Sequence, residues 1–196
     1  MGKINVAIIG VGNCASSLVQ GLFKYAEVDE SSDKISGVMH NVLGGYSIGD
    51  VNIVAAFDVD NEKVGKDLSE ALFTKNNNAI KFHDVPNIGV TVDRGMTHDG
   101  IGEYLKDVIE KAKGETSDIV GILREKKVDV VINYLPVGSE QATKWYVEQV
   151  LAAGCAFVNC IPVFIAKEPY WQKRFVDKGL PIVGDDIKSQ VGATIV

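Results

Sequence analysis

Short apolar runs alternate with longer stretches of helical spacing along most of this chain. A run that is apolar on both faces is typical of a strand buried in a parallel sheet. Such runs occur at 4–9, 53–57, 128–134, 156–158 and 180–183, with a weaker one at 89–93. Helical spacing occurs at 14–25, 61–73, 100–112, 119–127, 139–153 and 168–178. The alternation predicts an α/β fold, a doubly wound parallel sheet covered by helices.

Two segments interrupt this alternation. Residues 27–52 are polar and rich in glycine, and we expect an insertion there between the first helix and the second strand. Residues 75–99 are irregular and contain consecutive asparagines at 76–78. A chain of 196 residues, 46% of them hydrophobic, can bury a sizeable core. We therefore predict one domain over 1–196 that carries the inserted segment 27–52.

Charge and motif content argue against several partners. The formal net charge is -6, whereas a nucleic-acid partner would need a basic face. No apolar run approaches the roughly 18 residues of a membrane helix, and no signal-peptide pattern precedes the first strand. The cysteines form no CxxC motif and the histidines lack metal-ligand spacing. We predict a reduced, cytoplasmic protein with no membrane partner, no nucleic-acid partner and no metal. The cysteines are Cys14, Cys155 and Cys160, and the histidines are His40, His83 and His98.

A glycine-rich turn follows the first predicted strand directly. It reads Gly-Val-Gly-Asn-Cys-Ala and matches the pattern G-x-G-x-x-G/A. Gly10 allows the tight turn, Gly12 lets a pyrophosphate approach the backbone, and Ala15 keeps the helix close to the strand. The free N–H groups of the first helical turn, which holds Asn13 and Cys14, would face the phosphates. The alternative is a glycine-rich turn that binds no ligand.

The second predicted strand leads into Asp58, the expected partner of an adenosine ribose. Its carboxylate would accept hydrogen bonds from the ribose hydroxyls and repel a 2′-phosphate, which favours NAD over NADP as the cofactor. Asp58 lies further along the chain than the usual offset of about 20 residues. The insertion 27–52 accounts for the excess. The alternative is that Asp58 only caps a helix that begins near Asn61.

The predicted strand 128–134 leads into a loop that contains Pro136. Ligands of doubly wound sheets lie beyond the carboxyl ends of the strands, so this loop should lie beside the nicotinamide. An ordinary strand-to-helix turn, with Ser139 as the helix cap, explains the same residues.

The segment 184–194 follows the last predicted strand and reads Gly-Asp-Asp-Ile-Lys-Ser-Gln-Val-Gly-Ala-Thr. Its serine and second glycine would form a backbone nest for an oxyanion, and its lysine would add a positive charge. Its aspartates could hold a cation, or orient the nicotinamide and a substrate hydroxyl. The alternative is a helix N-terminus with acidic capping residues.

Three motifs together resemble the bacterial type of the myo-inositol-1-phosphate synthase family. They are Val-Gly-Asp-Asp-Ile-Lys-Ser-Gln-Val-Gly-Ala-Thr at 183–194, Tyr-Leu-Pro-Val-Gly-Ser-Glu at 134–140 and Val-Gly-Asn-Cys-Ala-Ser-Ser-Leu at 11–18. The resemblance runs along the whole chain, but family members are roughly twice as long. It implies an N-terminal NAD-binding domain of the Rossmann type. It also implies that the family's C-terminal substrate domain is not in this chain.

The resemblance implies an activity as well. The family is an isomerase that converts D-glucose 6-phosphate to 1L-myo-inositol 1-phosphate by NAD-dependent oxidation, enolisation, intramolecular aldol cyclisation and re-reduction. Carried over to this sequence, the catalytic positions are Asp186 and Lys188, and the substrate phosphate would be held by Ser189, Gln190 and Gly192.

On the resemblance alone, Asp67, Tyr146 and Asp185 are also expected at the cofactor site. By their own patterns, Asp67 is typical of a solvated helix face and Tyr146 of core packing. The resemblance further implies a homotetramer that takes glucose 6-phosphate as its substrate. Two other functions fit the same motifs: an ordinary NAD-dependent dehydrogenase that releases NADH, and an NAD-binding module without catalysis.

Overall fold

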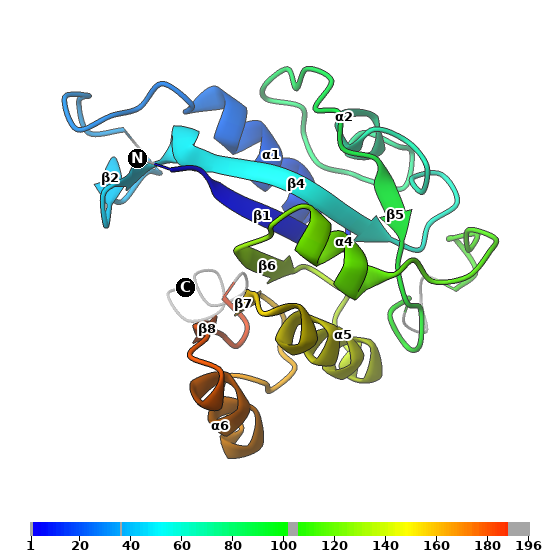
Figure 1. Ribbon diagram of the computed structural model, residues 1–196. Helices are drawn as coiled ribbons and strands as arrows, with labels where there is room; N and C mark the ends of the chain where they lie inside the picture. The colour runs from blue at the N-terminus through cyan, green and yellow to red at the C-terminus, as the bar shows by residue number, and fades with distance from the viewer. Residues whose placement is uncertain (1, 36, 102–105, 188–196) are drawn as a thin grey trace, which may run out of the picture.

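A six-stranded parallel sheet forms the centre of the computed structural model, which describes residues 2–35, 37–101 and 106–187 (Figure 1). The strand order is β5-β4-β1-β6-β7-β8. The chain begins in the middle, builds outward to one edge, and then extends the sheet on the other side. This is the order of a doubly wound nucleotide-binding fold, so the predicted fold class is confirmed. The strands are β1 (Ile4–Ile9), β4 (Val51–Asp58), β5 (Val92–Arg94), β6 (Val130–Asn133), β7 (Ala156–Asn159) and β8 (Ile182–Val183).

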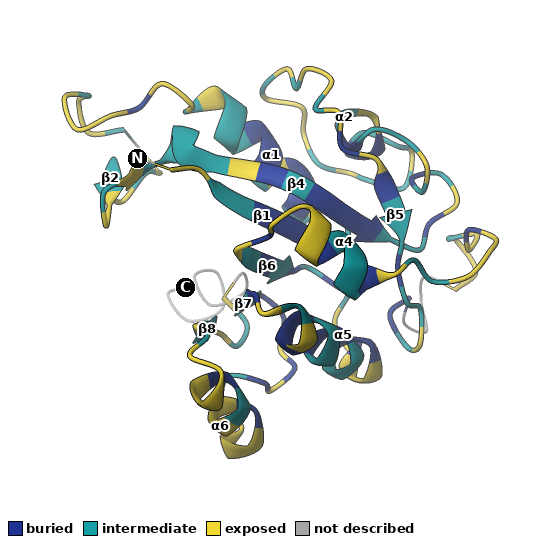
Figure 2. Ribbon diagram, in the orientation of Figure 1, coloured by how far each residue is buried: buried dark blue, intermediate teal, exposed yellow. Residues whose placement is uncertain are grey.

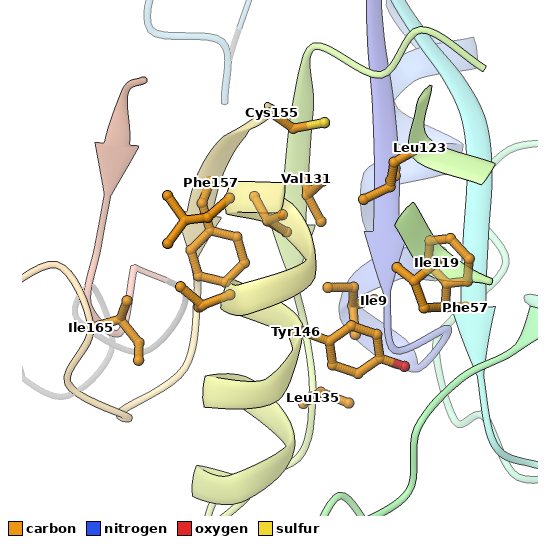
Figure 3. Close-up of a cluster of buried hydrophobic side chains, with 14 of the residues drawn as sticks. Ile9, Phe57, Ile119, Leu123, Val131, Leu135, Tyr146, Cys155, Phe157 and Ile165 are labelled. Atoms are coloured by element: carbon orange, nitrogen blue, oxygen red, sulfur yellow. The ribbon is translucent and has the colours of Figure 1, made fainter. Parts of the chain in front are cut away.

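Helices cover both faces of the sheet, because successive residues of a strand point to opposite sides. In β1, Val6 and Ile8 belong to the core beneath α1 (Asn13–Lys24) and α2 (Leu68–Ala71). Ala7 and Ile9 belong to the opposite core. Figure 2 shows buried residues along the middle of the sheet, and Figure 3 shows side chains of the second core. That second core lies beneath α4 (Ile119–Glu125), α5 (Glu140–Ala153) and α6 (Pro169–Asp177).

The register of the central strands brings three loops to one level. Ile9 at the end of β1 lies opposite Phe57 of β4 and Asn133 of β6. All three strands are parallel, so the residues that follow them leave from the same edge of the sheet. The glycine-rich turn, Asp58 and the loop after β6 are therefore neighbours.

The helix predicted over 61–73 is wrong. Turns occupy most of this stretch, and only α2 is helical. Gly65 has φ +85, in the left-handed region. The amides of Gly65 and Leu68 donate to the carbonyls of Val92 and Val90. The backbone in this stretch is thus satisfied by the segment that leads into β5 rather than along a helix axis.

The helix predicted over 100–112 is also wrong for the residues that the structure describes there. Residues 106–108 form a turn, and Lys111 forms an isolated bridge with Asp60. The amide of Ala112 donates to the carbonyl of Val59. These contacts tie the stretch to the loop after β4. The other four predicted helices are confirmed, with ends that differ by at most two residues.

The predicted insertion 27–52 contains a short hairpin of β2 (Val42–Leu43) and β3 (Tyr46–Ser47), followed by the 3-10 helix η1 (Ile48–Asp50). β4 begins at Val51, inside the segment that was predicted as inserted. Among the described residues, every helix is too short or too polar to cross a membrane.

Candidate dinucleotide site

A cleft lies at the carboxyl ends of β1, β4 and β6, where the strand order reverses. Its volume is about 260 Å³. Ligands of doubly wound folds bind at this switch point. Of the cofactor residues predicted from the sequence, the following line the cleft: Gly10, Gly12, Asn13, Asp58, Pro136 and Tyr146.

Gly10 is required by the protein itself. Its φ is +87, and a Cβ atom at this position would stand 2.9 Å from both the carbonyl carbon and the carbonyl oxygen of Tyr134. Its amide donates to the carbonyl of Phe57 at 2.8 Å. The turn is therefore pressed between the strands on either side of β1, and a side chain here would strain it.

Gly12 differs from Gly10 in both respects. Its φ of -97 is open to any residue, and a Cβ atom here would meet no atom of the described residues within 4 Å. Gly12 is the N-cap of α1, where no side chain caps the helix, and the first turn of α1 contains no acidic residue. The first N–H groups of α1 therefore face the cleft with their partial positive charge unbalanced.

The other residues of the turn divide between cleft and core. Asn13 is exposed, and its Oδ1 accepts a hydrogen bond from the amide of Asn78 at 2.7 Å. Ala15 is fully buried between α1 and the sheet. Cys14 is a half-buried free thiol.

Asp58 joins the glycine-rich turn to the end of β4. Its Oδ2 accepts from the amide of Val11 at 2.7 Å. Its Oδ1 accepts from the amides of Val59 at 2.7 Å and Asp60 at 2.9 Å. A carboxylate has about four acceptor positions, so one remains open on Oδ2. No helix begins near Asn61, which removes the alternative that Asp58 only caps such a helix.

Tyr146 of α5 belongs both to the core and to the cleft. Its ring packs among buried side chains (Figure 3), and its hydroxyl accepts from the amide of Met96 at 2.9 Å. Burial raises the pKa of this phenol above its ordinary value, so the group stays protonated. A Cβ atom at Gly95 would stand 2.1 Å from the Tyr146 hydroxyl. Tyr146 thus supports the segment after β5 that forms one wall of the cleft.

The N-terminus of α5 is closed by Asp99. Its carboxylate accepts from the amides of Gln141 at 2.8 Å and Ala142 at 2.9 Å. Ser139 occupies the N-cap position of α5, as predicted, but its side chain does not cap the helix, because that hydroxyl donates to the carbonyl of Pro136 at 2.6 Å. The N-terminal N–H groups of α5 are therefore occupied by a carboxylate of the protein. Among the described residues, no side chain caps the N-terminus of α1.

Sequence reasoning missed a buried polar group beside the cleft. Lys63 is only 4% exposed, and it lies 3.9 Å from Asp58 and 3.7 Å from Asp60. The sequence predicts a helix with a solvated face over 61–73, and a lysine on such a face does not stand out. The asparagine run at 76–78, which also lines the cleft, was treated as irregular loop. The three consecutive asparagine side chains could have indicated a polar site, since a loop without a function does not need them.

Asp67 does not line the cleft. Its carboxylate accepts hydrogen bonds from the amides of Ser69, Ile88, Gly89 and Val90. Desolvation opposes ionisation, but the hydrogen bonds from Ser69, Ile88 and Gly89 outweigh it and hold the pKa of Asp67 below its ordinary value. Asp67 therefore joins α2 to the segment before β5.

Asp185 and Asp186 follow β8, at the same edge of the sheet as the glycine-rich turn but beyond β6 and β7. Asp185 accepts from the Asn159 side chain at 2.7 Å, and from the amides of Ile165 and Ala166, each at 3.0 Å. Oδ1 of Asp186 is buried and has no hydrogen-bond partner among the described residues. Four predicted site residues lie outside the described part of the chain: Lys188, Ser189, Gln190 and Gly192.

Over residues 2–35, 37–101 and 106–187, no group of three or more His, Cys, Asp or Glu side chains could hold a metal ion.

The chain is similar along nearly its whole length to proteins named inositol-3-phosphate synthase. The protein of that name from Mycolicibacterium smegmatis is 59% identical over 194 residues, which cover 99% of this chain and 53% of that protein. The one from Corynebacterium glutamicum is 53% identical over 192 residues, which cover 98% of this chain and 53% of that protein. No family model matches the chain.

Solved structures agree on the fold. The crystal structure of Ari2 has a TM-score of 0.79 at 32% identity, over 94% of this chain and 54% of that one. A myo-inositol-1-phosphate synthase-related protein from Thermotoga maritima has a TM-score of 0.64 at 22% identity, over 94% of this chain and 55% of that one, which supports the fold alone. The chain spans about half the length of the curated relatives that it matches, and over that half it is similar to proteins named inositol-3-phosphate synthase.

Proposed function

We propose that this chain is the NAD-binding domain of an inositol-3-phosphate synthase and that its cleft holds the dinucleotide. The main support for the proposal is the position of Gly12. Neither its backbone conformation nor any protein neighbour requires a glycine there, yet it lines the cleft at the open end of α1. Room for a phosphate against the backbone is the physical reason that remains.

The parts of the bound dinucleotide would lie at different positions along the cleft. Its pyrophosphate would accept hydrogen bonds from the N–H groups at the start of α1, beside Asn13 and Cys14. Its adenosine ribose would donate to the open acceptor position of Asp58. Its nicotinamide end would lie toward Pro136 and Tyr146, which line the cleft next to the loop after β6.

The reaction would convert D-glucose 6-phosphate to 1L-myo-inositol 1-phosphate. NAD, when bound, supplies reversible removal of a hydride from the sugar. The segment after β8 would receive the substrate: Ser189, Gln190 and Gly192 would hold its phosphate, and Lys188 would balance the phosphate charge. Oδ1 of Asp186 is buried and has no hydrogen-bond partner among residues 2–187 that are described, which fits a group completed by a ligand or by further protein. Asp185 would orient this segment through its contacts to 165–167.

The remaining half of the enzyme would come from a second, C-terminal domain, since the relatives are about twice as long as this chain. Catalytic lysines that handle the oxyanions would reside there. The assembled enzyme would be a cytoplasmic homotetramer, with neither a membrane nor a nucleic acid as partner.

Calorimetric titration of the 196-residue chain with NAD and NADP tests the cofactor proposal. NAD should bind, and NADP should bind at least about fivefold more weakly, because a phosphate close to a carboxylate costs about 1 kcal/mol or more. Equal or tighter NADP binding would contradict the role of Asp58.

A second experiment separates the synthase from a dehydrogenase. The complete enzyme, supplied with glucose 6-phosphate and NAD, should form inositol phosphate without a steady rise in reduced-nicotinamide absorbance. Continuous accumulation of NADH would favour the dehydrogenase.

A further inference from the structure

Lys63 is a buried ammonium that no motif of the sequence assigns. It is 4% exposed, and lysine at this degree of burial is rare unless it is paired. Its Nζ lies 3.9 Å from Asp58 Oδ2 and 3.7 Å from Asp60 Oδ2, and it donates to Asn77 Oδ1 at 3.0 Å. It thus joins the end of β4 to Asn77, which lies 14 residues beyond Lys63 along the chain.

Residues 76–78, which we call the asparagine strap, are fastened across the glycine-rich turn. The Asn77 amide group donates to the carbonyl of Val11 at 3.1 Å and to that of Leu72 at 2.9 Å. The Asn76 amide group donates to Asp60 Oδ2 at 2.8 Å. Lys63 therefore stands at the centre of a network that includes Asp58, the strap and the turn.

The strap also decides how Asn13 faces a ligand. The amide of Asn78 donates to Asn13 Oδ1, so the NH₂ group of Asn13 cannot take that position. No described residue accepts from that NH₂ group, and Asn13 lines the cleft. The strap thus presents Asn13 as a hydrogen-bond donor beside the first N–H groups of α1.

We propose that Lys63 is a positioning residue for the dinucleotide, which sets the placement of Asp58 and of the asparagine strap at the adenosine end of the cleft. The proposal rests on the proposed NAD site. It adds that Lys63 connects two sides of that site, Asp58 and the asparagine strap. Without the ammonium, two adjacent carboxylates would face each other, and one of them, Asp60, is fully buried. Asn77 Oδ1 would also lose its donor.

The test compares Lys63→Met with Lys75→Met. Both replacements remove one ammonium, but Lys75 is 72% exposed and pairs with Glu62 away from the cleft. Calorimetry with NAD on the 196-residue chain should give unchanged affinity for Lys75→Met. Lys63→Met should bind about 10- to 100-fold more weakly, the range for loss of a hydrogen bond to a charged group.

A double-mutant cycle distinguishes positioning from a merely structural role. In a chain that already carries Asp58→Asn, Lys63→Met should weaken NAD binding by a smaller factor than in the parent, because one of the two groups through which Lys63 acts has been altered and only its contact with Asn77 remains to be lost. An equal loss in both backgrounds, or NAD affinity of Lys63→Met equal to that of Lys75→Met, would overturn the proposal.

Asn77→Ala provides a second test that leaves the buried charges in place, in case Lys63→Met does not fold. It should weaken NAD binding by about tenfold, since it disconnects the strap from Lys63 and from Val11; unchanged affinity would overturn the role of the strap. If the parent chain does not bind NAD, the proposed function itself fails. If the parent binds and the Lys63 and Asn77 variants bind equally well, only the role of Lys63 fails.

Discussion

At the scale of single residues, Gly10 and Gly12 occupy one turn for different physical reasons. Gly10 has a left-handed backbone, and a side chain there would collide with the backbone of Tyr134, so the fold requires glycine. Gly12 has an ordinary backbone and open space beside it, so only a ligand would be obstructed by a side chain there. Substitution of Gly10 should therefore affect the stability of the fold, and substitution of Gly12 should affect ligand binding.

We predict opposite effects for alanine at these glycines. Gly12→Ala should lower the free energy of unfolding by less than about 1 kcal/mol, since only an N-cap glycine is lost, while NAD affinity falls at least about tenfold. Gly10→Ala should destabilise the chain by about 2 kcal/mol or more, through the left-handed backbone and the contact with Tyr134. Denaturant unfolding and calorimetry measure the two quantities. A Gly12→Ala chain that binds NAD normally would contradict the phosphate position.

At the scale of elements, loops are fastened to neighbouring elements by carboxylates. Asp99 closes α5, Asp67 joins α2 to residues 88–90, and Asp185 joins the end of β8 to residues 165–167. Each carboxylate accepts several backbone amides that would otherwise lack partners in the fold. These loops are thus held by charge-assisted hydrogen bonds rather than by regular secondary structure.

Asp67 makes the stability of the chain depend on pH. Its folded pKa lies below the ordinary value of 3.8. Its contribution is therefore complete above that value and is lost as the pH falls through the lower, folded pKa. Asp67→Asn should cost about 1–3 kcal/mol at neutral pH, and the difference from the parent should shrink in strong acid. Urea unfolding over a pH series measures this, with Glu70→Gln on the exposed side of α2 as the control. A difference that does not change with pH would contradict it.

At the scale of the whole molecule, the sheet carries two cores, and the cleft opens where the strand order reverses between β1 and β6. A dinucleotide bound there would touch loops after β1, β4 and β6, so binding should stabilise the fold as a unit. At a free NAD concentration of 100 times Kd, the expected gain is about 2.7 kcal/mol. For a domain of this size that corresponds to a rise in Tm of about 5–10 °C.

Thermal melts with increasing NAD measure this coupling. Gly12→Ala should melt near the parent without ligand and should show little rise with NAD. An equal rise in both chains would mean that the nucleotide binds elsewhere.

The sequence predicted the six strands of the main sheet, four of the helices and the glycine-rich turn, but not the hairpin strands β2 and β3. The signals for the predicted elements are local: apolar periodicity for strands that are buried on both faces, and a glycine where φ is positive or space is needed. The contacts of Lys63 with Asn77, of Asp67 with residues 88–90 and of Asp99 with the start of α5 could not be predicted, because they join segments that are well separated in sequence and meet only when the loops pack. The stretches at 61–73 and 106–112 were misjudged for the same reason, since their backbone hydrogen bonds go to other segments and not along a helix.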